Sequence, residues 1–129
     1  AVLAEEGIEA TVVNMRFAKP VDAEIIQRLA RGVRRLITLE DHTLPGGFGS
    51  AVLESLADQG LLRNTRVLRL GIPDTFVPHG APKILHRLIG IDTESIVEST
   101  RKFINNSRFS QHQPELVRTA PDGEKAAAR

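Results

Sequence analysis

Three short runs of apolar and β-branched residues, each followed by a segment with helical spacing, constrain the fold of this chain more than any other feature. The runs are residues 10–17, 35–40 and 66–72. Such runs are typical of strands, and the segments after them repeat apolar residues every three or four positions, as amphipathic helices do. Strands that alternate with helices predict an α/β domain with α/β/α layers and a mainly parallel sheet.

The detail of the runs adds to this prediction. Residues 10–17 are apolar or β-branched at most positions, which favours a strand buried on both faces. Residues 66–72 alternate basic with apolar side chains, which is typical of a strand near the sheet edge with one solvated face. Asp22, Ser50 and Asp92 each precede a helical pattern and are expected to be N-caps.

A length of 129 residues allows one modest domain. The only methionine is Met15, and residues 1–6 are good helix formers followed by Gly7, which suits a helix C-terminus. We therefore expect the chain to begin inside a longer protein. Residues 1–105 are predicted to form a domain that is incomplete at its N-terminus, and residues 106–129 a polar tail that is disordered or extended.

Composition excludes several classes of function. The chain has no cysteine, so disulfides, thiolate metal sites and cysteine nucleophiles do not occur in it. The chain has 17 Lys and Arg residues and 16 Asp and Glu residues. This near-zero net charge does not indicate binding to nucleic acid or to an anionic membrane. Because no long apolar segment occurs either, we expect an aqueous, cytoplasmic location with neither nucleic acid nor membrane as partner.

The glycine-rich segment 45–50 is the first candidate for chemistry, because it lies between a predicted strand and a predicted helix. Backbone N–H groups at such a position can hold a phosphate. The segment lacks the spacing of a P-loop and of a dinucleotide-binding turn, so we favour a structural role in which the glycines allow a tight turn and a close approach.

The second candidate is a group at the carboxyl ends of the strands. His42 and His79 follow successive predicted strands, and Asp74 lies between them in the sequence. No metal-ligand spacing accompanies them, so surface or interface histidines are the favoured interpretation. The neighbouring acids Glu40 and Asp41 fit the exposed end of a strand.

Three segments together resemble a known family. Residues 12–22 (VVNMRFAKPVD), 46–52 (GGFGSAV) and 70–80 (LGIPDTFVPHG) are similar, in this order and spacing, to the C-terminal domain of the 1-deoxy-D-xylulose-5-phosphate synthase family, and the likeness covers residues 1–104. The first two segments also resemble related thiamine-diphosphate enzymes, such as transketolase and pyruvate dehydrogenase beta subunits. The third segment is more particular to the synthase.

The resemblance implies a parent transferase that decarboxylates pyruvate and joins the two-carbon unit to glyceraldehyde 3-phosphate. It implies a homodimer that uses thiamine diphosphate and Mg²⁺ and supplies isoprenoid, thiamine and pyridoxal synthesis. In the family the cofactor lies between the other two domains, so no catalytic, cofactor-binding or metal-binding residue is assigned in this chain. The segment is expected to act as a scaffold for domain packing and dimerisation.

The resemblance also implies that a further strand lies between 10–17 and 35–40 in the sheet. We expect another polypeptide, such as the remainder of the parent, to supply it. Five residues are candidate contacts with other domains: Phe48, Asp74, Phe76, Val77 and His79. Two alternatives remain open, a free-standing module that binds a small ligand through Gly47, His42 and His79, and a protein-interaction domain of a dehydrogenase complex.

Overall fold

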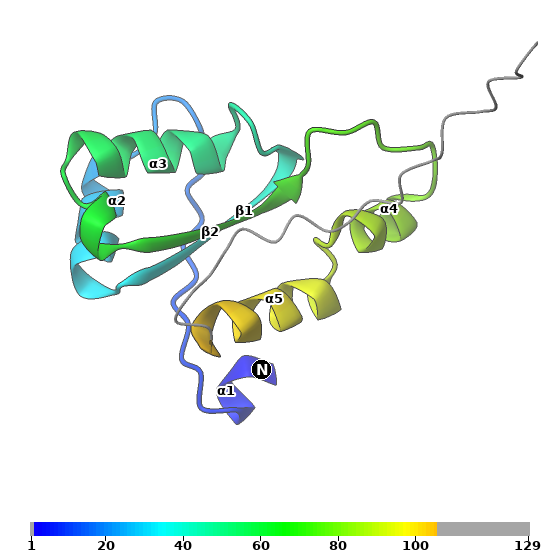
Figure 1. The fold of residues 1–129 in the computed structure, drawn as a ribbon, viewed down its shortest axis with the longest axis horizontal. Coiled ribbons are helices and arrows are strands. Elements are labelled where there is room, and N and C mark those ends of the chain that lie inside the picture. Colours follow the sequence, from blue (N-terminus) through cyan, green and yellow to red (C-terminus); the bar gives the residue numbers. More distant parts are fainter. Residues whose placement is uncertain (1, 106–129) are drawn as a thin grey trace, which may run out of the picture.

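The computed structural model describes residues 2–105 and places helices on both faces of a small sheet (Figure 1). The predicted tail, residues 106–129, lies outside the described residues. In chain order the elements are α1 (Val2–Glu5), α2 (Ala23–Gly32), β1 (Arg35–Thr43), α3 (Phe48–Asp58), the 3₁₀ helix η1 (Leu62–Asn64), β2 (Arg66–Ile72), α4 (Pro82–Ile89) and α5 (Thr93–Asn105).

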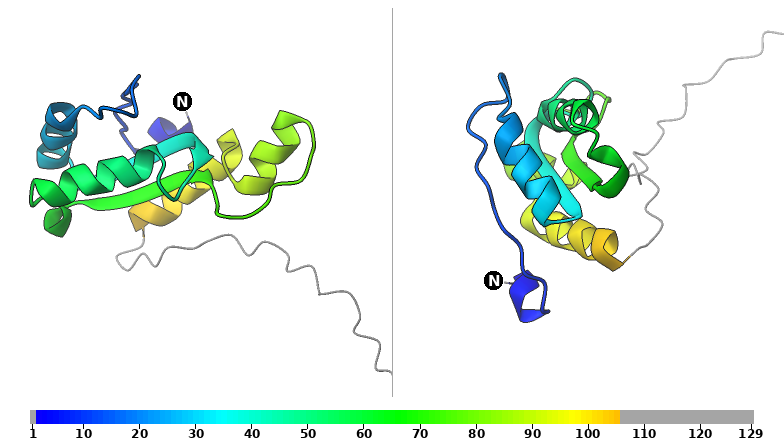
Figure 2. Two further views of the ribbon diagram at one scale, coloured as in Figure 1. Left: turned by 90° about the horizontal axis from the view of Figure 1, so that it is seen from above. Right: turned by 90° about the vertical axis from the view of Figure 1, so that its left-hand side faces the viewer.

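The two strands are parallel neighbours, which confirms the predicted α/β class with a parallel sheet. Arg35 lies opposite Arg66 and Leu39 opposite Leu70, and the register shifts before Thr43 pairs with Ile72. Helix α3 covers one face of the pair and α5 the other (Figures 1 and 2). The arrangement therefore has three layers.

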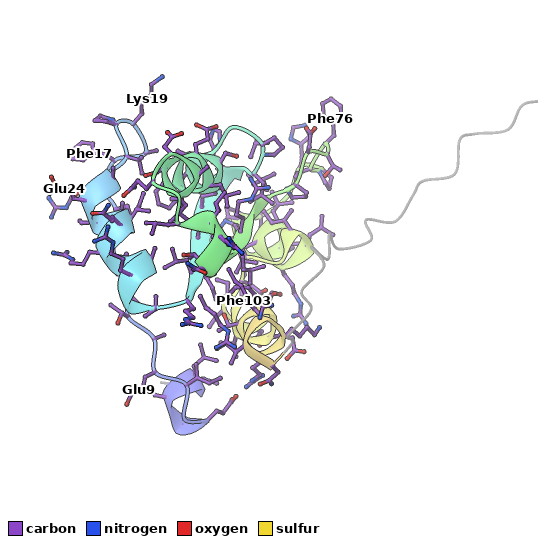
Figure 3. All side chains as sticks on the ribbon, turned by 60° about the vertical axis from the view of Figure 1, so that its left-hand side comes forward. Glu9, Phe17, Lys19, Glu24, Phe76 and Phe103 are labelled. Carbon is purple, nitrogen blue, oxygen red and sulfur yellow. The ribbon has the colours of Figure 1, made fainter. Side chains whose placement is uncertain are left out.

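The core lies on the α2 and α3 side of the sheet. Ile26 and Ala30 of α2 pack with Val52 and Leu56 of α3, and Leu36, Val67 and other half-buried residues surround them. Leu56 has no exposed surface. On the opposite face Phe103 of α5 is 1% exposed and lies between its helix and the sheet (Figure 3). The guanidinium of Arg66, on β2, lies over that ring at 5.1 Å from its centre. A cation–aromatic contact thus joins α5 to the sheet on this face.

Residues 10–17 do not form the predicted strand. Val12 is 92% and Phe17 69% exposed, and within this segment only Met15 packs against the core. Strand propensity is expressed through pairing and burial, and no described strand lies beside the segment to supply either. In the described part of the chain strand β1 is hydrogen-bonded to β2 alone, and its Leu39 is 52% exposed.

Two of the three predicted N-caps are confirmed. Asp22 and Asp92 each accept a hydrogen bond from the backbone N–H three residues on, at 2.9 and 3.2 Å. Helix α3 instead begins at Phe48, with Gly47 as the N-cap residue and no cap from its own side chain, so the prediction of Ser50 is wrong. The groups that replace that cap are described below.

An ion pair joins the first and last helical segments. The carboxylate of Glu6 accepts hydrogen bonds from Nε of Arg101, at 2.8 Å, and from a terminal nitrogen of the same guanidinium. Arg101 also lies 3.5 Å from Glu98 on its own helix. The bidentate contact fixes the end of α1 against α5, although the two residues are partly exposed.

This contact makes the position of α1 sensitive to acid. The hydrogen bond from Arg101 lowers the pKa of Glu6 below its ordinary 4.5. The contact is therefore fully present above pH 4.5 and is lost as the pH falls through the lowered pKa. An NMR titration is expected to show Glu6 and Nε–H of Arg101 changing together, and Arg101→Gln to return Glu6 to its ordinary value. An unchanged Glu6 titration in Arg101→Gln, as in the control Arg63→Gln, would contradict the assignment.

Candidate functional site

The loops after the two strands begin side by side. The backbone N–H of Leu44 donates to the carbonyl of Ile72 at 2.8 Å, which ties the exit of β1 to the exit of β2. As expected for parallel strands, the loops 44–47 and 73–80 therefore leave from the same edge of the sheet. This edge is the candidate site.

A buried carboxylate occupies the centre of this edge. Glu40 is 8% exposed and accepts hydrogen bonds from the backbone N–H groups of Phe48, at 2.6 Å, and Gly49, at 2.9 Å. The prediction that Glu40 is exposed is therefore wrong. Glu40 lies two residues after the buried Thr38 and therefore on the same face of β1. This two-residue spacing is the signal in the sequence that indicates the burial of Glu40. Glu40 already fills the N-terminus of α3, where a bound phosphate would sit.

The glycines around Glu40 have the structural role that the sequence favours. A Cβ added to Gly47 would lie 2.2 Å from Oε2 of Glu40 and 2.3 Å from the carbonyl oxygen of Thr43. A Cβ on Gly71 would lie 2.8 Å from Cγ of Glu40. The backbone approaches the carboxylate so closely that side chains at these positions do not fit.

An arginine closes the same loop from the neighbouring strand. Arg69 donates from one terminal nitrogen to the carbonyl of Leu44, at 3.1 Å, and to Oγ of Ser50, at 3.0 Å. The Ser50 hydroxyl in turn donates to the Leu44 carbonyl at 2.8 Å and accepts from the N–H of Gly46 at 3.1 Å. Arg69 is half-buried, so the expectation of a solvated basic face on β2 is wrong at this position. No pattern in the sequence singles out this role.

The histidines lie near this edge without forming a common site. His42 is exposed, with its Nδ1 3.2 Å from the carbonyl oxygen of Thr43, and His79 is exposed in the following loop. His86 of α4, which has no predicted partner, lies 3.5 Å from Asp41. Across residues 2–105 no three acidic or histidine side chains gather closely enough to hold a metal ion.

The predicted contact residues divide into two groups. Phe76 is fully exposed and projects from the loop after β2 (Figure 3), Asp74 and His79 are exposed with it, and Val77 is half-buried. Phe48 instead packs against the core from the first turn of α3. Helix α4 follows the loop and adds Ile84, 67% exposed, and Leu88, 46% exposed. The exposed apolar residues here are thus Phe76, Ile84 and Leu88.

A shallow hollow of about 470 Å³ lies between α4 and the start of α5. Its lining carries both signs of charge: Lys83 and His86 on one side, Asp92 and Glu94 on the other, with Ile91 and Thr93 between. This mixture does not select an anion such as a sugar phosphate.

Within the described residues no helix is long and apolar enough to cross a bilayer.

Comparison with known proteins identifies the domain. The family model for the transketolase C-terminal domain matches residues 1–96. The chain is 52% identical over 102 residues to 1-deoxy-D-xylulose-5-phosphate synthase 1 of Geobacter sulfurreducens, a match that covers 79% of this chain and 16% of the relative. It is 42% identical over 120 residues to the synthase of Burkholderia pseudomallei, covering 93% and 18% respectively. The chain thus spans about one sixth of the length of these relatives.

A solved structure agrees with the sequence comparison. A split gene transketolase, described as an inactive beta4 tetramer, superposes with a TM-score of 0.72 and is 33% identical. The match covers 83% of this chain and 34% of that one. The similarity in three dimensions therefore extends over most of the described residues.

Replacing Glu40 tests whether it caps α3. Glu40→Gln offers one oxygen to two N–H groups and turns an NH₂ donor toward them, at a cost of about 1–3 kcal/mol in local stability. Amide hydrogen exchange at Phe48 and Gly49 is expected to accelerate. The control Asp41→Asn changes the exposed neighbour and is expected to leave these amides unchanged. Equal exchange in both variants would contradict the capping role.

Proposed function

The chain belongs to the transketolase C-terminal domain family, and from this premise we propose that it is the C-terminal domain of a 1-deoxy-D-xylulose-5-phosphate synthase. The observation that carries the proposal is the 42–52% identity to proteins of that name over most of the chain. The transketolase structure, at 33% identity, is a more distant match. The proposed parent condenses pyruvate with glyceraldehyde 3-phosphate and releases CO₂.

Within such a parent we propose that this domain is a scaffold. The N–H groups at the carboxyl edge of the sheet are already engaged, since Glu40 accepts from the start of α3 and Arg69 donates to Leu44 and Ser50. Oγ1 of Thr38 and Nε of Arg69 are buried there without a partner among the described residues. The described residues therefore do not fit thiamine diphosphate, whose diphosphate needs free N–H donors or a metal site. Cofactor and Mg²⁺ are assigned to other parts of the parent, and no step of the reaction is placed on this chain.

The unpaired sheet edge supports a partner that is part of the same protein. Among residues 2–105 no strand pairs with the outer edge of β1 or lies beside the segment 10–17, and Leu39 of β1 is 52% exposed. We propose that the remainder of the parent supplies a strand between β1 and this segment. The homodimer and the cytoplasmic location belong to the same proposal.

Phe76 tests the scaffold role. Phe76→Asp places a charge where the exposed ring is expected to meet another domain, and it should weaken assembly of the full-length protein without weakening thiamine diphosphate binding. Mass photometry measures the first and calorimetric titration the second. Thr75→Asp, an exposed neighbour with the same added charge, is the control. Unchanged oligomer size and activity in Phe76→Asp would count against the proposal.

The isolated chain provides a separate test of the missing strand. Residues 1–129 made alone are expected to self-associate or to melt without cooperativity, because the β1 edge and segment 10–17 remain uncovered. Light scattering after size exclusion and a far-UV circular dichroism melt measure both properties. A monomer that melts in one sharp transition would overturn the proposal of a supplied strand.

A further inference from the structure

Helix α4 carries cations and no acid, although Asp74 lies in the loop before it and Asp92 and Glu94 line the same hollow as Lys83. From residue 75 to residue 91 the sequence contains no acid, although the whole chain is close to neutral. The permanent cations of this stretch, Lys83 and Arg87, are exposed on α4. Within the described part of the chain neither forms an ion pair. The hydrogen bond from Ser95 is the main cause that lowers the pKa of Asp92, and the charge of Arg87 adds a smaller lowering.

The same helix presents apolar side chains beside these cations. Ile84 and Leu88 are four residues apart and therefore neighbours on one helix face, and each directly follows a cation in the sequence. The inward positions are filled separately, since Leu85 is half-buried and Ile89 is 6% exposed. Ile84 and Leu88 therefore contribute nothing to the core of the described domain.

We infer that the exposed face of α4, formed by Lys83, Ile84, Arg87 and Leu88, binds an acidic, apolar surface on the remainder of the same polypeptide. The inference rests on the proposed function, which makes this chain one domain of a longer protein. The curated relatives are about six times longer, so a covalently attached partner is present at high effective concentration. Apolar residues surrounded by cations are complementary to an apolar patch surrounded by carboxylates.

Zero-length cross-linking with a carbodiimide tests this inference in the full-length protein. The reagent joins an amine to a carboxylate only where the two are in contact, so Lys83 is expected to link to an Asp or Glu outside residues 1–129. Lys102, whose Nζ lies 3.3 Å from Glu98, is the internal positive control. Lys83→Arg should lose the cross-link and keep the assembly, because the charge stays while the reactive amine is removed.

A charge reversal provides the second readout. Lys83 lies in the first turn of α4, where an acid suits the helix dipole, so Lys83→Glu is not expected to unfold the helix. It should weaken assembly about fivefold in low salt, and the difference should vanish in 0.5 M NaCl. Arg63→Glu, an exposed cation on η1, is the matched control and should have no effect.

The outcomes separate this inference from the proposed function. If Lys83 links only to carboxylates within residues 1–129, including those of a second copy, or links to none while Lys102 reacts, the inference is overturned. If the α4 inference is overturned but Phe76→Asp still disrupts assembly, the scaffold proposal stands without the contact at α4. If Phe76→Asp has no effect either, both are overturned.

Discussion

The contact between the Glu40 carboxylate and the first N–H groups of α3 is the interaction on which the carboxyl edge of this domain depends. It joins the end of β1 to the start of the helix that covers one face of the strand pair. Arg69 fixes the loop between them from the neighbouring strand, and the close approach of Gly47 leaves no space for another arrangement. These hydrogen bonds tie the loop to both strands, while Oγ1 of Thr38 and Nε of Arg69 are buried beside it without a hydrogen-bond partner among the described residues.

The arrangement supports the proposal that this domain is a scaffold within a larger enzyme. In many α/β proteins the N–H groups at this edge face a phosphate or a cofactor. Here an internal carboxylate, that of Glu40, occupies the position of such an anion and accepts from the two N–H groups at the start of α3. What remains available lies farther out, in the loop with Phe76 and the outer face of α4. Those are the surfaces that the proposed scaffold role assigns to contacts with other parts of the parent.

The sequence predicts those features that depend on a few adjacent residues. Asp22 and Asp92 are capping residues because the side chain and the N–H group that it binds are three positions apart. Residues 10–17 have the composition of a strand, yet a strand also needs a neighbour, and composition carries no information on whether one is present. Arg69 escaped prediction for a related reason, since the crossover through α3 brings its partners close. Glu40 meets the start of α3 through the short loop after β1, and only its position on the face of Thr38 indicates its burial.

The ion pair between Glu6 and Arg101 joins positions 95 apart, so the two ends of the described chain leave the domain from the same side (Figure 2). Helix α5, which has 13 residues and is about 20 Å long, runs from α4 at the far end of the domain to this ion pair. In the proposed parent, the covalent connection and the contact face of α4 are therefore separated by the length of α5, so each restrains a different end of the domain.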